Sequence, residues 1–336
     1  MKKGIVLLLV CMLVAVGFVA CSSGGGGGGG GGVTVDNSKA SGTFSIFSID
    51  ATTGFSVDRG TVTFDGAGHG TYASLVSADS GTFTYTVTVP GNAITINGTL
   101  VGTMNAAGNF FAAVDVSAGQ KVMMSGVKNS LAFTETSAIY VGGDFQYNSG
   151  TSGELFSVVT ATPSAGFLLY TSLSTTGTGT TDYALASNGT FTIDPSKLGG
   201  PDTFGAITGD KNILMFGDAE AIISPMQSVA VALKLPGFGM TLASLNGTYK
   251  AYEFMGAGTV IFDATRYRLT FNGSGGGTWT VEASSIPGTD SGTFAYTMNS
   301  DGTLNIDGFM DGVALQDGSV LSLMSTGVTA FIAIKQ

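Results

Sequence analysis

From residue 41 onward, apolar and polar residues alternate with a period of two, and no helical period is present. The stretch TFTYTVTV, residues 82–89, places threonine at every even position and an aromatic residue or valine at every odd one. The stretch RYRLTF, residues 266–271, alternates in the same way. This pattern predicts half-buried strands with one packed and one solvated face. Asp-Gly, Asn-Gly and Gly-rich steps separate the segments and favour tight antiparallel hairpins.

The chain also repeats itself. Three openings align, each a glycine, one further residue and an aromatic ring: Gly42-Thr43-Phe44, Gly143-Asp144-Phe145 and Gly247-Thr248-Tyr249. Each is followed by a closing strand that ends in lysine: Lys128, Lys234 and Lys335. The opening tripeptides and the closing lysines recur at intervals of roughly 100 residues, and such a period predicts homologous structural units. We therefore expect three β-units: unit one at 41–129, unit two at 142–235 and unit three at 245–336.

Two of the units share a heptad, DSGTFTY at 79–85 and DSGTFAY at 290–296. Unit two keeps only a partial match at Gly179-Thr180-Thr181-Asp182-Tyr183. We interpret the heptad as a polar turn that leads into an alternating strand, because Asp and Gly accept turn conformations. Its recurrence then indicates a duplicated fold, and its near absence from unit two argues against a shared ligand site.

Unit one contains about eight short segments of this kind, near residues 43–49, 60–65, 70–77, 81–89, 93–97, 99–105, 109–116 and 121–128. Consecutive strands joined by short turns form an antiparallel meander. A meander of this size buries its apolar face and removes its open edges by closing into a barrel. The predicted fold class is all-β, with three tandem meander units of about eight strands each, as small up-and-down barrels. A transmembrane barrel is disfavoured because its strands need about 9–11 residues, and a propeller or an open curved sheet remains as an alternative.

The opening of each unit carries a resemblance. A Gly-x-aromatic first strand, with a last strand that returns beside it, resembles the small barrels of the avidin and lipocalin kind. Those families usually have Trp at the aromatic position, where this chain has Phe44, Phe145 and Tyr249. The resemblance implies a lumen able to hold one small ligand, and it carries over no ligand residue.

The amino terminus has the order of a secretory signal peptide. Lys2 and Lys3 are followed by a nearly unbroken apolar run, residues 5–19, and then by Ala20 and Cys21. A basic start, an apolar run of this length and a small residue before the cut are typical of a cleaved leader rather than a spanning helix. We predict cleavage after Ala20, with residues 1–20 as the leader.

The four residues around the predicted cut, Phe18-Val19-Ala20-Cys21, resemble the lipobox of bacterial lipoproteins. The resemblance implies a diacylglycerol on the Cys21 sulfur and an acylated amino group, with acyl chains such as palmitate that hold the protein on a membrane. Cys11 is the rival, but Val10 is too large for the residue before the cut. An ordinary soluble secreted protein is the other alternative.

Residues 21–40 are predicted to form a tether. The nine glycines at 24–32 span about 17 Å as a random coil and about 30 Å when extended, so they hold a folded body away from the bilayer. By resemblance to lipoprotein sorting in bacteria with two membranes, Ser22 after the lipidated cysteine favours the outer membrane. The sequence therefore places the protein in the cell envelope, on either face of that membrane.

Charge and composition exclude several classes of function. The chain has 13 basic and 23 acidic residues, a net charge of -10 that becomes more negative when Lys2 and Lys3 leave with the leader. Such a body lacks the positive footprint that nucleic acid requires. With Cys21 acylated and His69 the single histidine, we expect no disulfide, no thiol nucleophile, no metal site of Cys or several His, and no cofactor.

Few residues offer chemistry. His69 lies four residues after Asp65 and could act as a general base, but a lone loop histidine is more often solvated, and the supposed counterpart in unit three, Asp263-Ala264-Thr265-Arg266, has none. The Asp-Gly steps of unit three fit hairpin turns better than a calcium loop. Trp279, the single tryptophan, is either a core residue or a ring on which a ligand stacks.

Together these observations predict a lipid-anchored envelope protein that is not an enzyme and that has a structural or surface role of the adhesion or interaction type. Its partners are the membrane, through the lipid on Cys21, and possible envelope proteins. The alternative is that a barrel lumen binds a small apolar ligand. The residues expected to face such a ligand are aromatic positions of the alternating strands: Phe83, Tyr85, Trp279, Phe294 and Tyr296.

Overall fold

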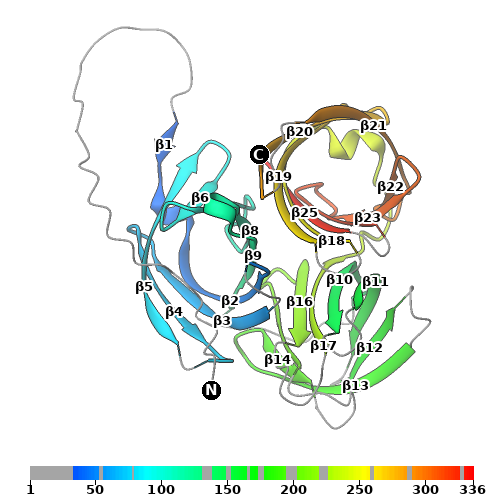
Figure 1. Cartoon of the computed structure of the whole chain (residues 1–336). Coiled ribbons are helices and arrows are strands. Elements are labelled where there is room, and N and C mark those ends of the chain that lie inside the picture. Colours follow the sequence, from blue (N-terminus) through cyan, green and yellow to red (C-terminus); the bar gives the residue numbers. More distant parts are fainter. Residues whose placement is uncertain are drawn as a thin grey trace, which may run out of the picture.

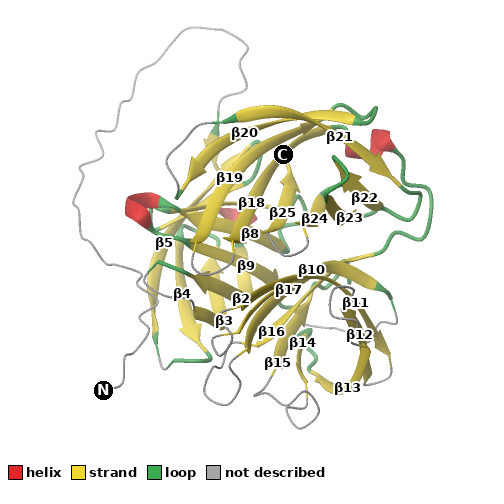
Figure 2. Ribbon diagram, turned by 45° about the vertical axis from the view of Figure 1, so that its right-hand side comes forward, coloured by secondary structure: helices red, strands yellow, loops and turns green. Residues whose placement is uncertain are grey.

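The computed structural model describes residues 33–336 apart from 53–55, 78, 131–137, 149–152, 165–166, 173–177, 194–202, 219–225, 258–260, 286–289 and 326–328. The predicted leader, Ala20, Cys21 and the glycine tether lie outside the described residues. Three antiparallel β-units lie side by side, coloured blue to teal, green, and yellow to red along the chain (Figures 1 and 2). The all-β prediction is confirmed, and in the described residues the only helical elements are short 3-10 turns.

Unit one follows the predicted meander. Its strands are β2 (Ser41–Asp50), β3 (Ser56–Asp65), β4 (His69–Ser74), β5 (Ser80–Val89), β6 (Ala93–Ile96), β7 (Leu100–Met104), β8 (Phe110–Asp115) and β9 (Val122–Lys128). Each strand pairs with the next, β5 with β6 included, and β9 returns to β2. The eight strands thus form a complete ring of pairings, at the positions that the alternation predicts.

Units two and three are closed eight-stranded barrels. Unit two consists of β10 (Tyr140–Asn148), β11 (Gly153–Ser164), β12 (Phe167–Ser172), β13 (Thr178–Leu185), β14 (Thr190–Ile193), β15 (Thr203–Ile207), β16 (Ile213–Asp218) and β17 (Met226–Lys234). Unit three consists of β18 (Gly247–Ala257), β19 (Ile261–Phe271), β20 (Gly276–Ser284), β21 (Ser291–Met298), β22 (Thr303–Ile306), β23 (Met310–Ala314), β24 (Val320–Ser325) and β25 (Thr329–Lys335). Closure rules out the propeller and the open sheet.

The folded body begins inside the stretch predicted as tether, which corrects that boundary. Strand β1 (Thr34–Val35) pairs with the end of β5, and the 3-10 turn η1 (Asn37–Lys39) follows it. The Asn37 side chain accepts the backbone N–H of Val87 at 2.9 Å. The Tyr85 hydroxyl donates to the carbonyl of Ala40 at 2.8 Å. Because this segment closes one end of the ring, it belongs to unit one.

The opening of unit two is also corrected. The closing lysines pair with Phe44 in unit one, Tyr140 in unit two and Tyr249 in unit three, so Tyr140 is the equivalent position rather than Phe145. The hydroxyls of Tyr140 and Tyr249 donate to backbone carbonyls of corresponding turns, at 2.8 and 2.7 Å. Unit two therefore begins before residue 142, because strand pairing sets the register and a similar tripeptide does not.

The recurring heptad has the same place in the register of all three barrels. Its glycine lies opposite an aromatic residue: Gly81 opposite Tyr72, Gly179 opposite Tyr170, and Gly292 opposite Trp279. A Cβ added to Gly81 or Gly292 would come within 2.7 Å of the facing ring. Glycine is needed at these two positions because a ring covers it, as aromatic residues do for glycines in strands. The partial match in unit two is thus the same structural element.

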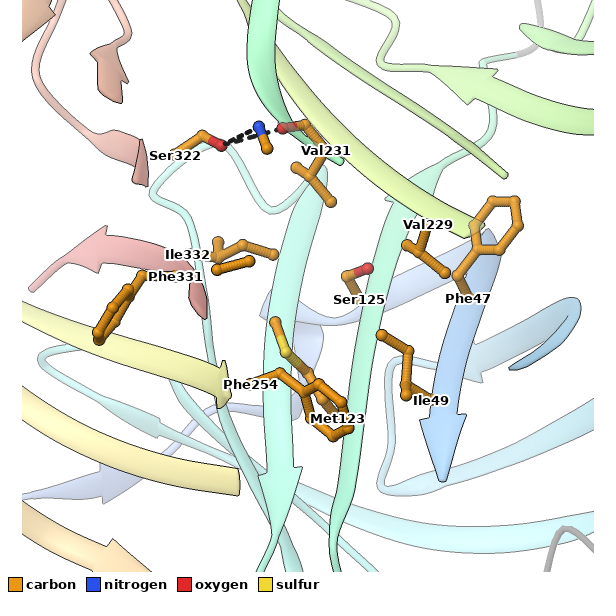
Figure 3. Close-up of a pocket in the computed structure, with 12 residues that line it drawn as sticks. Phe47, Ile49, Met123, Ser125, Val229, Val231, Phe254, Ser322, Phe331 and Ile332 are labelled. Atoms are coloured by element: carbon orange, nitrogen blue, oxygen red, sulfur yellow. Dashed lines mark hydrogen bonds between the residues drawn. The ribbon is translucent and has the colours of Figure 1, made fainter. Parts of the chain in front are cut away.

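The three units share one apolar core where they meet. It includes Phe47 of unit one, Val231 of unit two and Phe254 of unit three (Figure 3). Strands at this junction bury both faces: residues 110–114 of β8 and 320–324 of β24 are buried throughout. The prediction of one solvated face per strand is wrong here, because the outer faces of these strands pack on a neighbouring unit.

Polar contacts cross the same junction. The hydroxyls of Thr103 in unit one and Tyr252 in unit three are 2.7 Å apart. The Ser322 hydroxyl of unit three donates to the Val231 carbonyl of unit two at 3.0 Å and accepts the Gly143 N–H at 3.1 Å, as drawn in Figure 3. Gly143 is therefore a contact residue of the junction rather than the opening of a unit.

Candidate functional site

The lumen of unit three, seen end-on in Figure 1, is filled at one end and hollow at the other. At the filled end, Tyr249, Phe271, Phe294 and Tyr296 pack with their rings in edge contacts, with centroids 5.0–5.2 Å apart for the three pairs that involve Phe271. The 3-10 turn η3 (Leu242–Leu245) closes this end, and the Tyr296 hydroxyl donates to the Leu242 carbonyl at 3.1 Å. The strands of the alternating pattern thus supply a rigid floor.

The opposite end holds a cavity of about 510 Å³. Its lining is largely apolar and aromatic, and it includes Met255, Tyr267, Trp279, Phe309, Met310 and Phe331. Small-molecule sites have volumes of roughly 300–1,000 Å³ and a predominantly apolar lining with a few convergent polar groups. The cavity has the size and the surface of such a site. Phe309, 59% exposed, forms part of its rim.

Glu253 is the buried polar group of this cavity. It shares the inward face of β18 with Tyr249 and Ala251, and it is only 5% exposed. One carboxylate oxygen accepts the Thr329 hydroxyl at 2.8 Å, and the other accepts the Tyr267 hydroxyl. Burial raises the pKa of Glu253, and burial together with the charge of Glu253 raises the pKa of Tyr267. The site therefore presents a desolvated carboxyl group to the lumen.

A second buried carboxylate lies at the same end of the barrel. Asp263, also 5% exposed, accepts the hydroxyls of Thr265 at 3.0 Å and Ser284 at 3.3 Å, and that of Ser285 as well. Three hydroxyl donors satisfy it, as buried polar groups require. It is not among the residues that line the cavity, so of these two buried carboxylates Glu253 is the one available to a ligand.

We expect Glu253→Gln to raise the melting temperature at neutral pH. A carboxyl group whose pKa is raised in the folded state adds stability below its unfolded pKa, and that stability is lost as the pH rises through the folded pKa. The amide has no such loss and can still bond both hydroxyls. The two proteins should converge at acidic pH, where Glu253 is protonated in both states. Thermal unfolding against pH tests this, and a less stable Gln variant at neutral pH would contradict it.

The equivalent part of unit one differs. The pairing of Ser48 with Met124 corresponds to that of Glu253 with Phe331, so a serine replaces the acid. One part of the lumen of unit one is packed with rings, as the floor of unit three is: the Phe64 ring lies 4.8–5.9 Å from those of Phe44, Phe83, Tyr85 and Phe111. The acid is therefore absent from unit one, whereas in unit two the register places Asp144 at the position of Glu253.

The ligand-facing residues predicted from the sequence divide into two groups. Trp279 and Phe294 line the cavity. Tyr296 lies on the closed floor of the same barrel, while Phe83 and Tyr85 pack in the aromatic core of unit one. Sequence reasoning missed Glu253, although an acid at an apolar-face position of an alternating strand is a signal that could have identified it.

His69 lies at the surface beside Asp65. Its side chain is exposed, and its Nδ1 lies 3.7 Å from Asp65 Oδ2. The backbone N–H groups of Ala67, His69 and Gly68 donate to Asp65 and lower its pKa. The strand register makes Asn272 the counterpart of Asp65 in unit three. Asn272 likewise accepts backbone N–H groups of the loop that follows it. The alignment of Asp65 with Asp263 is therefore wrong. Asp65 is a turn residue.

The outer face of unit three carries a basic cluster. Lys250, Arg266 and Arg268 surround Glu282, which a β-bulge opposite the step from Arg266 to Tyr267 directs outward. Burial would raise the pKa of Glu282, but the three cations outweigh it and the pKa is lowered. This charge cluster joins β18, β19 and β20 and lies on the side of the sheet opposite the cavity.

Across the described part of the chain, no three or more His, Cys, Asp or Glu residues gather in a group that could hold a metal ion. Within the same residues, no helix has the length and apolar character needed to cross a membrane.

Comparison with known proteins identifies no family. No family model matches the chain, and no curated protein matches it. A solved structure of a mutant transferrin binding protein B from Haemophilus parasuis Hp5 is similar at 9% identity and a TM-score of 0.30, over 90% of this chain and 77% of that one. Transferrin binding protein B from serogroup B Neisseria meningitidis is similar at 10% identity and a TM-score of 0.30, over 89% of this chain and 77% of that one. Likenesses this low support no inference about function.

Proposed function

We propose that this protein is a lipid-anchored, non-catalytic binding protein of the bacterial cell envelope that holds a small, mainly apolar ligand in the lumen of unit three. The observation that carries the proposal is the cavity of about 510 Å³ with an aromatic lining. An apolar ligand gains about 25 cal/mol for each Å² of apolar surface that it buries. The floor of packed rings and η3 fixes the cavity before a ligand arrives, which limits the entropic cost of binding.

The predicted membrane anchor supports the same function. The predicted lipid on Cys21 and the glycine tether would keep unit three near a membrane, where apolar molecules are concentrated. In this proposal the interaction that the sequence predicts is the binding of a ligand by the barrel of unit three. Location at the outer membrane is part of the proposal, and it is supported by Ser22 through the resemblance to lipoprotein sorting in bacteria with two membranes.

The single tryptophan provides the test. Trp279 lines the cavity, so all tryptophan emission comes from the site. We expect decanol to change the Trp279 emission of the purified Cys21→Ser protein, which has no acyl chains to compete for the lumen. The double variant Ile306→Phe/Leu323→Phe adds two rings to the lining, and it should weaken binding by about tenfold or more because the apolar volume is lost.

Val76→Phe is the matched control, since it adds a ring on the surface of unit one, where Val76 is exposed. It should bind decanol as the parent protein does. Emission that does not respond to decanol, or that responds equally in the filled variant, would overturn the proposed function.

A further inference from the structure

The charges that line the cavity have one sign. Among the described residues, the charged ones that line it are Glu253 and Asp307, both acidic, and no described Lys, Arg or His lines it. A fatty acid or another anionic amphiphile would place its head group against these carboxylates with no cation to pair with it. Like charges brought together in a desolvated site are strongly unfavourable. The lining therefore selects against anionic ligands.

Glu253 can accept more hydrogen bonds than its present partners donate. Both of its hydrogen bonds come from neutral hydroxyls, those of Tyr267 and Thr329. Among the described residues, no basic side chain forms an ion pair with it. A buried carboxylate without a cation is costly, and its two oxygens together accept about four hydrogen bonds. A ligand that brings its own cation would offset this cost.

The rings beside Glu253 favour the same ligand. Tyr267 lies between Trp279 and Phe331, with ring centroids 6.2 and 5.8 Å away. Aromatic faces attract ammonium groups, and they do so more strongly where water is excluded. The remaining lining, which includes Leu269, Ile306 and Leu323, is suited to an alkyl or aryl body.

We infer that the ligand of the unit-three lumen is an apolar amine, whose protonated nitrogen donates a hydrogen bond to Glu253 while its hydrocarbon part fills the cavity. This inference rests on the proposed function, because it names the class of ligand for the same site. A neutral alcohol of the same length would keep the apolar contacts and lose the ion pair. A carboxylate would lose the ion pair and add repulsion.

Three probes with one hydrocarbon chain test the inference: decylamine, decanol and decanoate. Each is titrated at neutral pH, below its micelle concentration, into the Cys21→Ser protein, and Trp279 emission is followed. We expect decylamine to bind about tenfold or more tighter than decanol, because a desolvated ion pair with hydrogen bonds adds to the apolar contacts. Decanoate should bind weakest.

A charge variant assigns the preference to one residue. Glu253→Gln should lower the affinity for decylamine by about tenfold or more and change the affinity for decanol by no more than about threefold. Asp311→Asn, the same loss of charge at an exposed position on β23, should leave all three affinities unchanged. The filled double variant Ile306→Phe/Leu323→Phe should lose decylamine binding too, which separates the lumen from adsorption to the acidic surface.

The outcomes separate the two proposals. If decanol binds as tightly as decylamine, or decanoate binds tightest, the amine class is overturned while the proposed function stands. If none of the three probes binds, both fall. The probe series on the protein with Glu253 intact decides the question even where the Gln variant does not fold.

Discussion

Phe254→Ala is expected to lower the free energy of unfolding by about 3–5 kcal/mol, the usual loss for a buried aromatic residue. Phe254 is 1% exposed and belongs to the core that all three units share. Its removal enlarges the small cavity that Phe47 and Val231 also line (Figure 3), and these two side chains cannot move inward because each is fixed in the sheet of its own unit. The cost should therefore lie toward the upper end of this range.

Urea unfolding followed by Trp279 emission measures this effect, and Phe238→Ala is its matched control. Phe238 is 83% exposed, so the same substitution should change stability by no more than about 0.5 kcal/mol. A loss below about 1 kcal/mol for Phe254→Ala would show that the junction adds little to the stability of unit three, and that the three barrels are held together mainly by the chain.

Cys21→Ser is expected to move the protein from the membrane fraction to the soluble fraction. Without the thiol no diacylglycerol can be attached, and each buried CH₂ of an acyl chain contributes about 0.8 kcal/mol to membrane binding. The acidic body offers no replacement, since its net charge, more negative than the -10 of the full chain, repels anionic lipid surfaces. Fractionation of cells that express each protein, with detection of the body, measures the change.

Cys11→Ser separates lipidation from secretion. Cys11 lies within the predicted leader, and its substitution keeps the apolar run nearly intact. It should leave the protein on the membrane. Retention of Cys21→Ser in the membrane fraction would refute the lipid anchor, and loss of both variants from the membrane would point to a failure of export instead.

The strands were predictable because their signal is local. Alternation over 82–89 gave the inner face of β5, and Phe83, Tyr85 and Val87 are all buried there. The opening of unit two was not predictable from the tripeptide Gly143-Asp144-Phe145. Its position depends on pairing with Lys234, a residue far along the chain, and only the closed barrel reveals that pairing.

The candidate site was predictable in part. Trp279 and Phe294 face the lumen because they lie on the apolar face of alternating strands. Whether that lumen is hollow depends on the summed volumes of side chains from strands on all sides. Unit one packs Phe44, Phe64 and Phe111 against one another in its lumen, and unit three leaves one end of its lumen hollow, although the two units share their heptad.

The sequence by itself determined an all-β chain, its three repeated units, the order of its hairpins and the place of the heptad, since each of these follows from contacts between near neighbours. The tertiary structure alone decided that the outer faces of β8 and β24 are buried between units, and that Glu253 lies beside a cavity in one barrel. These features depend on packing between residues far apart in the chain. The hydrophobic period and the motif spacing do not indicate which side chains pack against one another.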